Sequence, residues 1–182
     1  LLSSDFKKAE SLARTIELFN IERKQLDQKI TEEAKDQILK NKEENKYSSV
    51  VFKSDWRKGV IGIVASRLID EYYRPTIVFT SSGKFLSGSA RSIRGLDIYR
   101  ILESCKEYIV KFGGHKYAAG LTIRKELYSE FKNAFENSVS KFILPEHMTP
   151  KIFYDLEISF NKITPKFCRI INQMAPFGPG NN

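Results

Sequence analysis

PTIVFTSSGKFLSGSAR, residues 75–91, is the stretch of sequence that decides the fold. Residues 75–80 are rich in β-branched and aromatic side chains, residues 81–84 have turn composition, and Phe85 to Arg91 forms a second β-type run. Working outward, residues 47–53 predict a further short strand. Residues 59–73 predict a helix with its apolar side chains on one face. The order strand, helix, strand, strand indicates an α/β fold.

The same alternation continues toward the C-terminus. Asp97 is expected to cap a helix that extends through Lys111. The run 112–115 (FGGH) should end that helix, and residues 117–124 predict another strand. Residues 127–142 then predict an amphipathic helix, so that strands and helices alternate through the whole central part.

The two flanking segments have different patterns. Residues 5–44 predict one long helix or two collinear ones, with a narrow apolar stripe, N-cap oxygens at Ser3, Ser4 and Asp5, and a possible kink near Asn20. Pro145 and Pro150 frame a linker, after which residues 152–160 alternate like a half-exposed strand. A helix is expected from Thr164-Pro165 to about Met174. Without an initiator Met and with a Gly/Pro-rich end, the 182 residues are interpreted as a piece of a longer protein.

Composition excludes several classes of protein. A hydrophobic content of 41% is too high for a disordered chain, and no apolar run has the length of a membrane helix or the pattern of a signal peptide. Cys105 and Cys168 are expected to be buried thiols, although a disulfide remains possible. The two histidines are His115 and His147, and no CxxC, HExxH or DxD occurs. The sequence therefore offers no self-contained metal site.

The net charge of +8 is concentrated in the central segment. Residues 47–124 hold 13 basic and 6 acidic side chains, net +7, whereas residues 1–46 are neutral overall. A solubilising surface is the ordinary meaning of such a bias. Because the same segment carries Gly and Ser motifs, we favour an anionic ligand that contains phosphate.

The first candidate motif is SGSARS, residues 87–92. In a strand, Ser87, Ser89 and Arg91 share one face, and Gly88 allows close approach of a ligand or backbone. Two hydroxyls and a guanidinium form a plausible phosphate cradle, to which Arg94 adds charge. A polar edge strand is the alternative, and on residue types alone it is the better supported one.

Two further motifs contain paired or closely spaced glycines. Gly113-Gly114-His115 follows the predicted helix, where the backbone N–H groups would form an anion-binding nest and His115 would donate a hydrogen bond. The alternative is an ordinary glycine helix cap before a packed strand. In residues 56–62 (WRKGVIG) a helix N-terminus could hold an anion, but a core tryptophan with close packing at Gly62 is favoured.

Taken together these runs resemble a known family. WRKGVIGIVASRLIDEYYRPTIVF (56–79), GSARSIRGLDI (88–98) and FGGHKYAAGLTI (112–123) occur in the order and spacing of the DHHA1 domain of the RecJ-type single-strand exonucleases, which belong to the DHH phosphoesterases. PFGPGN (176–181) is similar to the start of the oligonucleotide-binding (OB-type) region of that family. The leading helix, with residues 20–23 (NIER), resembles its connector helix. The resemblance implies a mixed sheet flanked by helices, with a connector at 1–45, a DHHA1 domain at 46–143 and a truncated OB-type segment at 144–182.

The resemblance also implies a function. It indicates the substrate-binding part of a cytoplasmic 5′→3′ exonuclease on single-stranded DNA that acts in DNA repair and recombination. Such an enzyme has Mn²⁺ or Mg²⁺ in a DHH domain, and it has possible partners in a helicase and a single-strand-binding protein. If the roles of the family's residues apply to the matching positions here, two motifs would bind phosphate. Ser89, Arg91 and Ser92 would lie at the 5′-phosphate. Gly113, Gly114 and His115 would contact the substrate phosphate near the metals.

The piece itself should bind weakly and not cleave, because the metal-binding motifs of the DHH domain are absent from it. Two alternatives stay open. One is a DHH-family oligoribonuclease or dinucleotide phosphoesterase. The other is a non-catalytic nucleic-acid-binding module, such as a tRNA-recognising DHHA1 appendage of a synthetase.

Overall fold

The computed structural model describes residues 4–152, 154–178 and 181. By its contacts the chain divides into two compact units, Leu1–Pro150 and Lys151–Asn182. Each unit is described by itself. The candidate phosphate-binding motifs all lie in the first.

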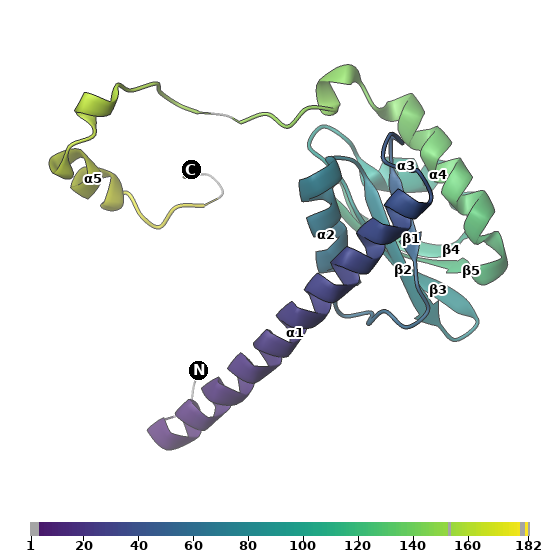
Figure 1. The fold of residues 1–182 in the computed structure, drawn as a ribbon, viewed down its shortest axis with the longest axis horizontal. Coiled ribbons are helices and arrows are strands. Elements are labelled where there is room, and N and C mark those ends of the chain that lie inside the picture. Colours follow the sequence, from purple (N-terminus) through teal and green to yellow (C-terminus); the bar gives the residue numbers. More distant parts are fainter. Residues whose placement is uncertain (1–3, 153, 179–180, 182) are drawn as a thin grey trace. The chain divides into compact units, whose positions relative to one another are not determined.

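A five-stranded mixed sheet forms the centre of the first unit (Figure 1). The strands have the spatial order β1-β2-β3-β5-β4, with β1 parallel to β2 and every other neighbouring pair antiparallel. Their bounds are β1 Ser49–Phe52, β2 Thr76–Ser82, β3 Phe85–Arg91, β4 Ile109–His115 and β5 Ala118–Arg124. This arrangement confirms the α/β class with a mixed sheet, and β3 coincides with the predicted strand.

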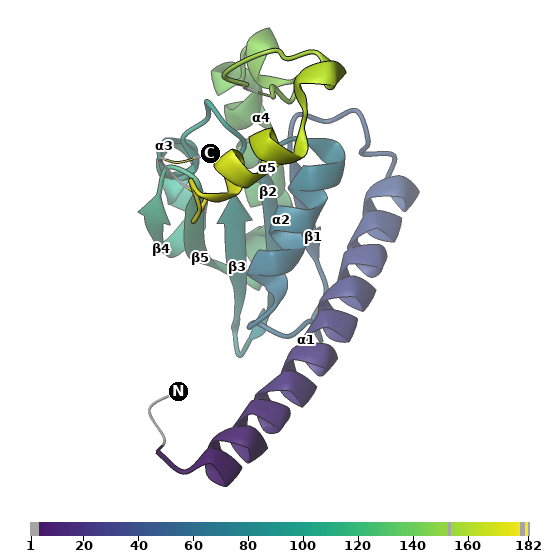
Figure 2. The ribbon, with the colours of Figure 1, turned by 90° about the vertical axis from the view of Figure 1, so that its left-hand side faces the viewer.

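The helices cover the two faces of this sheet unequally (Figure 2). On one face, α3 (Ile98–Ser104) and α4 (Tyr128–Phe142) build an apolar core with Phe131 and Phe135 against Phe79 of β2. On the other face, α2 (Ile61–Tyr72) and the C-terminal part of α1 (Phe6–Lys40) pack against β1 and β2. On that side α2 contacts β2 and β3, whereas β5 and β4 lie beyond it. Among the described helices of the first unit, α2 therefore leaves that side of β5 and β4 uncovered.

One long helix, α1, precedes the sheet. Asp5 caps it by accepting a hydrogen bond from the Lys8 backbone N–H at 3.2 Å, as predicted. The helix is continuous through Asn20 without a sharp bend in either view, so the expected kink is not found. Its buried residues begin only at Asp27, whose carboxylate lies 2.7 Å from the Arg67 guanidinium of α2. The second half of α1 therefore fixes the helix to the sheet unit.

The predicted helix from Asp97 to Lys111 is wrong in its second half. Asp97 does cap α3, accepting hydrogen bonds from two backbone N–H groups, but α3 ends at Ser104. After a 3₁₀ turn at Lys106–Tyr108, Ile109 begins β4, which pairs with β5 as the edge of the sheet. A run of β-forming residues that can pair with a neighbouring strand overrides the apolar helical spacing on which the prediction rested.

The second unit contains α5, Pro165–Asn172. Thr164 caps it by accepting a hydrogen bond from Phe167 N at 3.2 Å, which confirms the predicted helix start. The strand predicted for residues 152–160 is not formed in its described part, 152 and 154–160, while residue 153 lies outside the described residues. An isolated strand without a hydrogen-bonding partner is not stable in water. Cys168 is exposed, so the prediction of a buried thiol holds only for Cys105.

The remaining short 3₁₀ turns connect these elements, at Lys125–Leu127, Pro145–His147 and Phe160–Lys162. Among the described residues, no helix combines the length and the apolar character that crossing a membrane requires.

Candidate functional site

Three cross-strand rows of residues cover the open face of β3, β5 and β4. Residues directly opposite one another in antiparallel strands project from the same side of a sheet. The register gives the first row as Arg91–Ala118–His115, the second as Ser89–Gly120–Gly113 and the third as Ser87–Thr122–Lys111. We call this surface the open face.

The first row brings together two residues that lie 24 positions apart in the sequence. Arg91 of β3 and His115 of β4 flank Ala118 of β5. Neighbouring strands are ~4.8 Å apart, so the two backbones are separated by roughly 10 Å, with only a methyl side chain between them. Both side chains belong to the same side of the sheet.

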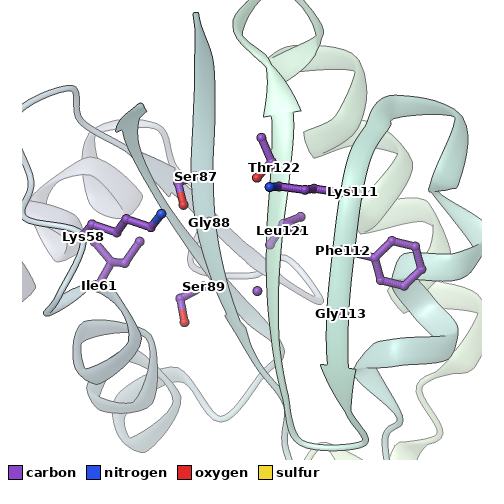
Figure 3. Close-up of a pocket in the computed structure, with 11 residues that line it drawn as sticks. Lys58, Ile61, Ser87, Gly88, Ser89, Lys111, Phe112, Gly113, Leu121 and Thr122 are labelled. Carbon is purple, nitrogen blue, oxygen red and sulfur yellow. The ribbon is translucent and has the colours of Figure 1, made fainter. Parts of the chain in front are cut away.

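A cavity of ≈ 520 Å³ lies over the second and third rows (Figure 3). Its floor includes Gly113 and Gly120, where an added Cβ would meet no atom within 4 Å. Lys58, from the loop before α2, and Lys111, from β4, also line the cavity, and in Figure 3 the Lys58 ammonium is directed toward Ser87 and the Lys111 ammonium toward Thr122. The described lining residues include no carboxylate, so the cavity suits an anion.

The guanidinium of Arg91 is positioned by its immediate neighbours. Its Nη1 donates to Ser89 Oγ at 3.0 Å and to the Ala90 carbonyl at 2.9 Å. A Cβ built on Gly62 in the first turn of α2 would lie 2.8 Å from Arg91 Nη2. Within the described part of the chain no hydrogen-bond acceptor is found for Nε or Nη2. One edge of the fork is thus available for the oxygens of a phosphate.

Ser92 lies just beyond the end of β3 and has a different environment. Its hydroxyl donates to the Leu96 carbonyl at 3.1 Å, and its backbone N–H donates to the Tyr117 carbonyl at 3.0 Å. These bonds close the loop that leads to α3. Ser92 is therefore adjacent to Arg91 in space, but its hydroxyl proton is already used within the protein.

The two glycines of the Gly-Gly-His motif are part of a strand, so the predicted nest at a helix end is wrong. Gly113 faces the open side, whereas the missing side chain of Gly114 faces β5, where a Cβ would lie 2.5 Å from Ala119 Cα. Gly114, with φ +155°, lets β4 approach β5 closely before His115. Gly113 instead contributes bare backbone to the cavity floor.

Gly88 and Trp56 are residues of the core. A Cβ on Gly88 would lie 2.5 Å from the Phe79 ring, so the space left by its missing side chain is filled by that ring, while its backbone lies among the residues that line the cavity. Trp56 is buried and donates from Nε1 to Glu33 Oε2 at 2.8 Å, which confirms the packing interpretation. That bond, together with one from Lys53, holds the pKa of Glu33 below its usual value.

Sequence reasoning missed Lys58, Lys111 and Thr122 as site residues. The net charge of +7 in residues 47–124 was a signal for both lysines, but it did not show which basic residues converge. Lys111 was assigned to a helix, and only the β4–β5 register places it beside Thr122. Among residues 4–152, 154–178 and 181, no three His, Cys, Asp or Glu side chains come together as a metal site would require.

The mixed sheet and its basic open face together are features of one family of protein domains. The DHHA1 domain family matches residues 19–141, and the chain belongs to that family.

Similarity to particular proteins extends further along the chain. It is 35% identical over 189 residues to the single-stranded-DNA-specific exonuclease RecJ of Haemophilus influenzae, covering 99% of this chain and 33% of that protein. It is 34% identical to RecJ of Bacillus subtilis, covering 98% of this chain and 23% of that protein. The crystal structure of RecJ in complex with Mn²⁺ from Thermus thermophilus superposes with a TM-score of 0.84 at 25% identity, covering 100% of this chain and 26% of that one.

These comparisons confirm the resemblance to the DHHA1 part of the RecJ exonucleases. The chain spans about a third or less of the length of the curated relatives that it matches.

Proposed function

We propose that this chain is the substrate-holding part of a metal-dependent 5′→3′ exonuclease on single-stranded DNA. Similarity along nearly the whole chain to proteins named for that activity supports the proposal. The single observation that carries it here is the first row of the open face. That row sets Arg91 and His115 on one side of the sheet, next to the row of Ser89, Gly120 and Gly113. The second row lines the carboxylate-free cavity, whereas Arg91 and His115 themselves are not among its lining residues.

In this proposal the residues of the open face bind and orient the strand. Arg91 grips the 5′-terminal phosphate through Nε and Nη2, while Ser89 holds the guanidinium through Nη1. His115 donates a hydrogen bond to a phosphate oxygen at the other end of the row. Gly113 and Gly120 let the sugar–phosphate backbone lie directly against the sheet. The loop-closing bond of Ser92 supports Arg91 from beside it.

Mn²⁺ or Mg²⁺ would activate the water that attacks the phosphodiester. The open face does not fit such ions, because its polar groups are hydroxyls, ammonium groups, a guanidinium and an imidazole, and hard cations prefer carboxylate oxygens. We place the metal ligands in a DHH domain, in the part of the relatives' length that this chain does not span. The proposed division is a connector at 1–45, this DHHA1 domain at 46–143 and the start of an OB-type region at 144–182.

The wider role proposed is DNA repair and recombination in the cytoplasm, with a helicase and a single-strand-binding protein as partners. Family resemblance alone supports these points.

Binding by the chain itself tests the proposal. We expect it to bind a single strand of about 20 nucleotides with an affinity that falls steeply between about 50 and 200 mM salt, because phosphate contacts release counterions. A strand with a 5′-phosphate should bind more tightly than the same strand with a 3′-phosphate. Equal binding of the two ends, or tighter binding of a dinucleotide than of the long strand, would contradict it, and the second result would favour a small-substrate phosphoesterase.

A further inference from the structure

The third row of the open face has the composition of a second phosphate site. Ser87 and Thr122 supply hydroxyls, and Lys58 and Lys111 stand on opposite sides of them. In Figure 3 the Lys58 ammonium is directed toward Ser87 of β3 and the Lys111 ammonium toward Thr122 of β5. Both ammonium groups and both hydroxyls can donate hydrogen bonds to a bound anion, and the ammonium groups add positive charge.

Lys58 and Lys111 belong to the lysines of this unit that have no ion pair among the described residues, unlike four others. Lys35, Lys46, Lys53 and Lys132 each lie within ion-pair distance of a glutamate. Within the described residues, no carboxylate lies within that distance of Lys58 or Lys111. Both are exposed at the rim of the cavity. Their positive charges are therefore directed at the cavity without being neutralised by the protein.

The distance along the sheet determines which phosphate reaches this site. Ser87 precedes Arg91 by four residues of β3, and a strand rises ~3.4 Å per residue, which separates the third row from the first by about 14 Å. Successive nucleotides of one strand advance at least ~3.4 Å, and more when the strand is extended. A phosphate about two to four nucleotides from the 5′ end would span that distance, passing over Gly113 and Gly120.

We propose that Lys58 and Lys111 bind an internal phosphate of the same single strand whose 5′-phosphate is held by Arg91. This inference rests on the proposed function. It assigns the open face two phosphate subsites, so the chain should discriminate strands by length as well as by their 5′ end.

The test measures the affinity of the intact chain for oligothymidylates of two to eight nucleotides, each with a 5′-phosphate or a 5′-hydroxyl, at several salt concentrations. For the unmodified chain, affinity should rise at least fivefold once the strand is long enough to reach the third row. The double variant K58Q/K111Q should lose that rise and bind the dinucleotide within twofold of the parent. Its salt slope on the eight-nucleotide strand should be smaller by about 1.4, at ~0.7 per lost contact on a single strand.

Lys141→Gln is the matched control, because Lys141 is an exposed lysine on α4, which packs on the other face of the sheet. A double variant that keeps both the length-dependent rise and the parental salt slope would overturn the second subsite. Failure of the proposed function gives a different result, since the parent itself would then show no preference for a 5′-phosphate at any length. Thermal unfolding of each variant confirms that the fold is retained.

Discussion

Replacing Gly62 by alanine tests how Arg91 is positioned. The added methyl carbon would lie 2.8 Å from Arg91 Nη2 and 3.0 Å from Ser89 Oγ. An ordinary contact between such atoms is about 3.5 Å, so the guanidinium must move by roughly 0.7 Å. Because Nη2 is the end of a flexible side chain, this movement requires little change in the fold. Alanine is also favoured over glycine within a helix by up to ~1 kcal/mol, so the free energy of unfolding should stay constant or rise.

The same displacement should weaken phosphate binding. Lengthening a hydrogen bond from ~2.9 to ~3.6 Å takes it outside bonding geometry. A charge-assisted bond contributes ~1.5–3 kcal/mol, so its loss should reduce the preference for a 5′-phosphorylated strand about tenfold or more.

Fluorescence anisotropy with 5′-phosphate and 5′-hydroxyl strands measures that preference, and urea unfolding measures stability. Gly59→Ala is the control, since a Cβ there meets no atom within 4 Å. If Gly62→Ala keeps the full preference, or unfolds more easily than the parent, the positioning role is refuted.

Three further predictions concern the packing of the core, the carboxylate of Glu33 and the reactivity of the two thiols. Gly88→Ala should lower the free energy of unfolding by about 1–3 kcal/mol in urea titrations, because its Cβ would collide with a buried phenyl ring; an unchanged midpoint would contradict this. Since hydrogen bonds from Trp56 and a nearby lysine lower the pKa of Glu33, its contribution to stability is present above the unfolded pKa of ~4.3 and is lost as pH falls through the lowered value. Glu33→Gln should therefore lose less stability than the parent between about pH 7 and pH 3, and an equal loss would argue against the assignment. At about pH 8 a thiol reagent should modify Cys168 quickly and Cys105 slowly, because burial raises the pKa of Cys105, and equal rates would be inconsistent with the structure.

Local patterns predicted most of the fold. The alternating residues of β3 and the caps at Asp5, Asp97 and Thr164 are properties of neighbouring residues, so the sequence carries them directly. The strand β4 was missed because Ile109 continues the helical spacing of α3, and only pairing with β5 determines which conformation forms.

The candidate site was predictable to the extent that it lies on one strand. Alternation alone places Ser89 and Arg91 on a common face. That His115 shares this face depends on the registers of two strand pairs, which no local pattern contains. The contrasting roles of Gly88 and Gly113, one in the core and one on the cavity floor, likewise depend on which face each glycine occupies.

The most direct test of the central claim is the 5′-phosphate preference of Arg91→Ala, with Arg91→Lys for comparison. The claim is that the first row of the open face holds the terminal phosphate of a single strand. We expect Arg91→Ala to bind phosphorylated and hydroxyl-ended strands equally, and Arg91→Lys to retain part of the preference as a point charge without the planar fork. Parental preference in Arg91→Ala, with unchanged affinity for phosphorylated ends, would contradict the claim.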